Sequence, residues 1–171
     1  LTLATNPWLL LVGIAYAVIF AVNVALATHG QERSMLNDTV FIIECVALIP
    51  VLWAIGVDQV VGSPPSFFAL PPAVWLAMAM AFMAMVGSTL HVKSLIRERA
   101  NPRYRWYSLV WAVASIGVAA ILGWTLGVNI AAVSLAFVFL AGRSIALGDT
   151  PRKPGVLGMV ELVGFILVLL G

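Results

Sequence analysis

The chain has 171 residues, of which 63% are hydrophobic and only 9% are charged. Soluble domains usually carry about 25% charged residues, so this composition excludes an ordinary water-facing surface and favours an integral membrane protein. The formal net charge of +2 leaves too little positive charge for a basic stripe, which argues against a nucleic-acid partner.

Six apolar runs are long enough to cross a membrane. A helical span through about 30 Å of hydrocarbon needs about 20 apolar residues, with a lower limit near 17. An isolated strand would leave its backbone groups unpaired in lipid, so the predicted fold is all-α, a polytopic transmembrane helix bundle. In chain order, the six helices are predicted over residues 7–27, 39–55, 73–95, 106–126, 130–147 and 155–171. We expect them to form a single transmembrane domain over residues 1–171.

Polar or helix-breaking residues separate the predicted helices. Residues 28–38 are polar, and Asp38 can cap the second helix. Proline pairs within residues 56–72 cannot continue a helix. Residues 96–105 are strongly basic. The break at residues 127–129 is the shortest, and without it the fourth and fifth helices would form one long, bent element.

All lysines and arginines fall in or beside three of the predicted connections. Six crossings place the first, third and fifth connections on one side of the membrane, and positively charged connections stay in the cytoplasm. We therefore expect a multi-pass protein of the bacterial cytoplasmic membrane, with its basic loops in the cytoplasm. The positive residues are Arg33 in the first connection, Lys93, Arg97, Arg99, Arg103 and Arg105 around the third, and Arg143, Arg152 and Lys153 around the fifth.

Two glutamates lie within predicted helices. Glu44 and Glu161 are both placed roughly 8–9 Å inside the membrane boundary, at about 1.5 Å per helical residue. An intramembrane carboxylate is costly unless it is paired, protonated or hydrated, so both are candidates for a ligand or relay site. The alternative is an error of a few residues in the helix boundaries. Gly158 and Gly164 flank Glu161, and small residues there suit close packing against a neighbouring helix.

Polar residues near the first and third connections supply the other candidates for a ligand site. Their cations can bind anionic lipid headgroups, at about 1 kcal/mol each, or hold a substrate phosphate, which arginine matches bidentately. A solvated loop and a simple orientation signal stay open as alternatives for the two segments. The candidates are Asn23, Glu32, Asn37 and Asp38 near the first connection, and His91, Lys93, Arg97, Glu98 and Arg99 near the third.

No cofactor and no metal site are expected. The two histidines, His29 and His91, are placed in a loop and near a helix end, unlike paired haem ligands at membrane depth. Cys45 is the only cysteine, which excludes an intramolecular disulfide and a multi-cysteine metal site. The sequence has no phosphate-binding glycine loop, nucleophile elbow or zinc pattern. Whether the protein is an enzyme stays open.

Three segments resemble the YwiC-like family of bacterial polytopic membrane proteins. They are GQERSMLND at residues 30–38, the basic run HVKSLIRERANPRYRWYS at 91–108, and RKPGVLGMVE at 152–161. The resemblance implies a bacterial inner-membrane location and no established activity. Because family members are longer at the N-terminus, the chain would correspond to their C-terminal two thirds and lack N-terminal helices. The residues carried over by resemblance are Glu32, Asn37, Asp38, Lys93, Arg97, Glu98, Arg99 and Glu161.

Three functions are compatible with these features. The favoured one is binding of a lipid-like or anionic small molecule at the cytoplasmic face. The second is a membrane transporter with Glu44 and Glu161 as relay residues. The third is a non-catalytic accessory subunit that contacts other membrane subunits. In each case the expected partners include the lipid bilayer and anionic lipid headgroups.

Overall fold

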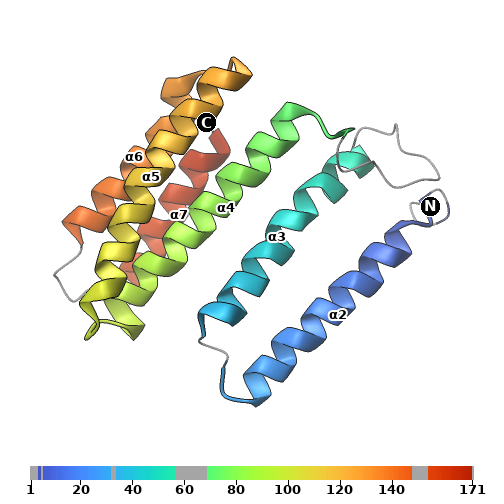
Figure 1. Ribbon diagram of the computed structural model, residues 1–171, viewed down its shortest axis with the longest axis horizontal. Helices are drawn as coiled ribbons and strands as arrows, with labels where there is room; N and C mark the ends of the chain where they lie inside the picture. Colours follow the sequence, from blue (N-terminus) through green and yellow to red (C-terminus); the bar gives the residue numbers. More distant parts are fainter. Residues whose placement is uncertain (1–3, 5, 32–33, 57–68, 148–153, 171) are drawn as a thin grey trace. The chain divides into compact units, whose positions relative to one another are not determined.

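A computed structural model describes residues 4, 6–31, 34–56, 69–147 and 154–170, and these residues contain no β-strand. The elements are α2 (Leu9–Thr28), α3 (Met35–Gly56), α4 (Pro72–Val92), the π-helical turn η2 (Lys93–Arg97), α5 (Pro102–Leu126), α6 (Ile130–Ala146) and α7 (Pro154–Leu170), shown in Figure 1. Each of the six predicted apolar runs coincides with an α-helix, so the prediction of an all-α fold is confirmed.

Helix length and composition show a membrane protein. Among the described residues, four helical segments are long and apolar enough to cross a membrane: Leu9–Thr28, Met35–Gly56, Pro72–Arg97 and Pro102–Leu126. The apolar helices α6 and α7 have 17 residues each, which is at the lower limit of about 17 residues for a span. Their exposed side chains include Leu135, Val138 and Leu169, as expected for a surface that lies in lipid.

The chain divides into two compact units, Leu1–Met78 and Ala79–Gly171, which we call the first and second unit. In the first unit, α2 and α3 pack as an antiparallel hairpin (Figure 1). In the second unit, α5 packs on α6, and α6 packs on α7. The expectation of a single transmembrane domain over residues 1–171 stays a prediction.

The helix α3 begins earlier than the predicted start at residue 39. Ser34 explains the difference, because its Oγ accepts a hydrogen bond from the Asn37 backbone N–H at 3.1 Å. Ser34, rather than Asp38, therefore provides the side-chain cap. Asp38 lies in the first turn of the helix, where the positive end of the helix dipole favours a carboxylate. Asn37 and Asp38 are thus helical residues and do not belong to the connection.

The helix α5 also begins earlier than the predicted start at residue 106. The Asn101 side chain accepts a hydrogen bond from the Arg103 backbone N–H at 3.2 Å. Pro102 occupies the start of the helix, where its missing N–H would have no intrahelical partner. Arg103 and Arg105 therefore lie on the first turn of α5, although the sequence placed them in a connection.

The predicted break between α5 and α6 is present. Gly127 has φ of 67°, in the left-handed region that favours glycine. The Val128 N–H returns to the Gly123 carbonyl at 3.0 Å and closes the end of α5. The Asn129 side chain then caps α6 by accepting the Ala131 N–H at 3.0 Å. Local backbone chemistry thus turns the chain back on itself and lets α6 pack along α5.

Candidate functional site

A buried ion pair lies inside the second unit. Arg143 on α6 pairs with Glu161 on α7, and their side chains are only 3% and 10% exposed. The Ser88 hydroxyl on α4 donates a hydrogen bond to the same carboxylate oxygen, Oε2 of Glu161, at 2.5 Å. Three helices of the second unit therefore meet at one polar contact.

Two further polar side chains near the end of α4 are buried. His91 is 1% exposed and Lys93 is 3% exposed. His91 follows Ser88 by one helical turn, and it is close enough to Arg143 to interact with its charge. Lys93 begins the π-helical turn η2. Such turns are rare and occur frequently at functional sites. We call Ser88, His91, Arg143 and Glu161 the polar cluster.

The polar cluster lies inside the second unit, a few residues from one end of its helices. The connection from α4 to α5, the last turn of α6 and the first turn of α7 are all at this end (Figure 1), which we call the basic end because Arg97, Arg99 and Arg103 lie there. At about 1.5 Å per residue, Arg143 lies roughly 5 Å from the end of α6 and Glu161 roughly 10 Å from the start of α7. A lone charge at this depth is costly, and removing one partner of a buried pair typically costs about 3–5 kcal/mol.

Several buried polar atoms of the cluster have no hydrogen-bond partner among the described residues. They are Nε2 of His91, Nε of Arg143 and Oε1 of Glu161. An unpaired buried polar group costs about 1–3 kcal/mol. In native structures such groups call for an explanation, such as a bound water, ion or ligand. The polar cluster can therefore accept a further polar group without losing an existing hydrogen bond.

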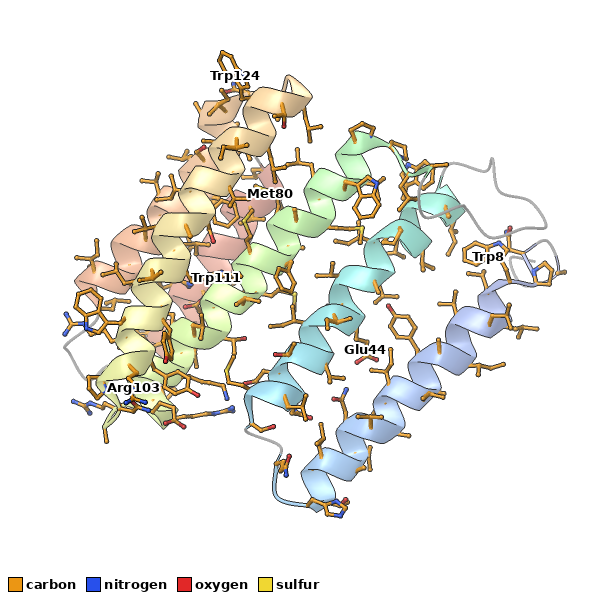
Figure 2. All side chains as sticks on the ribbon, viewed as in Figure 1. Trp8, Glu44, Met80, Arg103, Trp111 and Trp124 are labelled. Atoms are coloured by element: carbon orange, nitrogen blue, oxygen red, sulfur yellow. The ribbon has the colours of Figure 1, made fainter. Side chains whose placement is uncertain are left out.

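A smaller polar contact in the first unit involves Glu44. The Asn23 side-chain amide donates to Oε2 of Glu44 at 3.3 Å, and the Tyr16 hydroxyl donates to the Glu44 backbone carbonyl at 2.6 Å. Figure 2 shows Glu44 on α3, directed toward α2. Glu44 is only half-buried, and the described residues provide it with no ion pair. It therefore depends on an amide and on partial exposure, unlike Glu161.

The structure brings only some of the predicted site residues together. Glu161 and His91 belong to the polar cluster, and Lys93 is buried near the end of the same helix. Asn23 and Glu44 contact each other. Arg97 and Arg99 are exposed and do not pair with Glu161, and Glu98 caps η2. Asn37 and Asp38 lie at the start of α3, and Glu32 lies outside the described residues. The roles proposed for these residues stay predictions.

Sequence reasoning missed Arg143 and Ser88 as site residues. Arg143 lies close to the end of α6, so it was interpreted only as part of the orientation signal. A usable signal was nevertheless present, because Val133, Phe137 and Leu140 lead to Arg143 with the spacing of one helix face, and all of them are buried. An arginine that continues the buried face of a helix needs a partner inside the bundle.

Among the described residues, no group of three or more metal-ligating side chains is close enough to hold a metal ion.

The chain is similar to proteins of the YwiC-like family, whose family model matches residues 1–53. The uncharacterized protein YwiC of Bacillus subtilis is 26% identical over 168 residues, which cover 96% of this chain and 63% of the relative. An uncharacterized protein of Haemophilus influenzae is 32% identical over 91 residues, which cover 53% of this chain and 34% of the relative. The chain thus spans less than two thirds of the length of either relative. No solved structure matches the chain significantly. These matches support the family resemblance predicted from the sequence.

Proposed function

We propose that this YwiC-like membrane protein binds an anionic, lipid-like small molecule at the basic end of its second unit, with the acidic head group at the polar cluster. The observation that carries the proposal is the buried Arg143, whose Nε has no hydrogen-bond partner among the described residues. Arginine donors form a planar fork that matches carboxylate and phosphate oxygens. Glu161 neutralises the guanidinium charge, and Nε of Arg143 and the His91 ring can bind the head group.

The surroundings of the polar cluster favour a ligand with an apolar body. The cluster lies within apolar helices, so a ligand that reaches it has its remaining atoms in or beside lipid. Arg97, Arg99 and Arg103 are exposed at the same end and would attract an anion, at about 1 kcal/mol per cation near the membrane surface. Figure 2 shows Arg103 at this end. On the proposed orientation, the basic end faces the cytoplasm from a bacterial inner membrane.

Binding of dodecyl phosphate to the purified protein in nanodiscs of zwitterionic lipid tests the proposal. We expect Arg143→Gln to weaken binding by about 10–100-fold, because a hydrogen bond to a charged group contributes about 1.5–3 kcal/mol. The matched control is Arg103→Gln, which removes the same charge from an exposed position at the same end. It should weaken binding several-fold at most. Isothermal titration calorimetry measures both dissociation constants.

Equal losses in the two variants would contradict the proposal, because they would indicate attraction to the basic surface alone. Circular dichroism and gel filtration in detergent check that each variant is folded. Should Arg143→Gln not fold, Arg143→Gln combined with Glu161→Gln replaces it, because the double variant leaves no unpaired charge inside the bundle. The double variant should also lose binding.

Membrane transport is the second candidate function, favoured by two carboxylates inside separate helices. Glu44 accepts a hydrogen bond from Asn23, and Glu161 accepts one from Ser88. Intramembrane carboxylates held in this way serve as proton relays in many transporters. Liposomes that contain the protein and a pH-sensitive dye test this candidate. Proton flux should fall in Glu44→Gln and in Glu161→Gln, and flux that is unchanged in both variants would remove transport as a candidate.

A further inference from the structure

An apolar groove runs between α4 and α5 within the second unit, separate from the polar cluster. It is open to one side and has a volume of about 280 Å³, close to the lower end of about 300–1,000 Å³ that is usual for ligand pockets. Its walls are formed by Phe82 and Met83 on α4, and by Trp111, Ala114 and Val118 on α5. Figure 2 shows Trp111 on the side of α5 that faces α4.

Polar groups on the walls of the groove have partners within the protein. The Trp111 indole N–H donates to the Met83 carbonyl at 2.9 Å, and the Ser115 hydroxyl donates to the Trp111 carbonyl at 2.8 Å. The rings of Phe82 and Trp111 meet edge to face, with centroids 6.1 Å apart. A groove whose donors are already bonded offers an occupant only apolar contact, which suits a hydrocarbon chain.

Trp111 lies at the end of the groove that is nearer to the basic end. Gly87 lies beside Trp111, and a Cβ built on it would be 3.3 Å from Cδ1 of the indole. The ring therefore lies close against α4 at Gly87, the residue that precedes Ser88 in the chain. At about 1.5 Å per residue, Trp111 is roughly 9 Å along α5 from Arg105. A chain lying in the groove thus has its polar end within reach of the basic end.

We propose that this groove holds the single hydrocarbon chain of the same anionic molecule whose head group binds the polar cluster. This inference rests on the proposed function. The cations at the ends of both groove helices favour a chain that carries an acidic head group over a neutral one. A chain in a membrane is already surrounded by hydrocarbon, so close packing against Phe82 and Trp111, rather than release from water, holds it in place.

Photo-crosslinking tests the groove directly. The probe is a long-chain alkyl phosphate with a diazirine near the end of its chain, added to the protein in nanodiscs. We expect crosslinks in the segments 79–83 and 111–118, mapped by mass spectrometry. Excess dodecyl phosphate should compete with the crosslinking, whereas uncharged dodecyl maltoside should not.

A matched pair of variants locates the chain within the groove. Ala114→Trp fills the groove and should reduce these crosslinks about tenfold. Val113→Trp adds the same bulk at the neighbouring position, which is 56% exposed and does not line the groove, and should leave the yield unchanged. Val118→Trp also fills the groove and replaces Ala114→Trp should that variant not fold.

The outcomes separate this inference from the proposed function. Crosslinks that dodecyl phosphate suppresses, but that map outside segments 79–83 and 111–118, would overturn the proposal that the groove holds the chain. This conclusion would hold even when Arg143→Gln still weakens binding. Crosslinks spread over the lipid-facing helices, with no response to dodecyl phosphate, would indicate ordinary bilayer contact and would also overturn it. Unaltered binding in Arg143→Gln would instead reject the proposed function itself.

Discussion

Glu44 and Glu161 both lie inside apolar helices, but their surroundings differ between the two units. Glu161 is buried, pairs with Arg143 and accepts a hydrogen bond from Ser88. Glu44 is half-buried, and its carboxylate accepts a hydrogen bond from Asn23 at 3.3 Å. A carboxylate removed from water needs a cation and further hydrogen bonds, whereas a partly exposed one can keep some hydration. In the part of the chain that the structure describes, Glu161 is therefore held by a fixed charge pair, and Glu44 is not.

The helices that supply the partners of these glutamates, α2 with Asn23 and α6 with Arg143, differ in the same way. In the first unit, α2 contributes no buried residue, so its surface is left to lipid or to other protein. In the second unit, α6 buries Val133, Phe137 and Leu140 on the face that also carries Arg143. Packing of this face holds the guanidinium opposite Glu161 on α7. Close packing of an apolar helix face thus fixes the partner of the buried charge in the second unit.

The largest expected effect comes from breaking the charge pair. Glu161→Gln leaves Arg143 buried without a counter-charge, and we expect a loss of about 3–5 kcal/mol in the free energy of unfolding. Arg143→Met combined with Glu161→Leu removes both charges and should recover most of that loss. Unfolding in mixed detergent micelles, followed by circular dichroism, measures both variants. A single variant as stable as the wild type would show that Glu161 does not balance the charge of Arg143.

The next effect concerns the two glycines on either side of Glu161. A Cβ built on Gly164 would overlap the Leu140 side chain of α6, whereas nothing lies within 4 Å of one built on Gly158. We therefore expect Gly164→Val to cost about 1–3 kcal/mol by overpacking. Gly158→Val, which also replaces a helical glycine, should cost less than Gly164→Val. The same unfolding assay compares the two variants, and equal costs would contradict a close approach of α6 and α7 at Gly164.

The sequence predicted the fold well because composition and run length determine where helices cross a membrane. Its errors at helix starts have a local cause. Ser34 and Asn101 cap α3 and α5, yet both stand in polar segments that resemble connections. Each cap lets its helix begin inside the polar segment, several residues before the predicted start. The basic residues Arg103 and Arg105 were thus assigned to a connection although they are helical.

The candidate site was less predictable for a different reason. Glu161 was identified because a carboxylate interrupts an apolar run, and that signal requires no knowledge of packing. Its partner Ser88 depends on the rotation of α4 about its axis. A helix that is apolar on all faces has no sequence periodicity that fixes this rotation. Arg143 was hidden by its position near a helix end, where orientation alone explains a positive charge.

The smallest expected effect sharpens the comparison at Glu44. Glu44→Gln preserves the shape of the side chain and can still accept a hydrogen bond from Asn23, so we expect a change below about 1 kcal/mol in the free energy of unfolding. Asn23→Leu, which removes the donor, should cost no more than about 1–3 kcal/mol, because Glu44 is only half-buried. Unfolding measured as for Glu161→Gln places the two glutamates on one scale. A loss at Glu44 as large as the loss at Glu161 would mean that the first unit also depends on a buried charge, and the contrast between the two units would then be wrong.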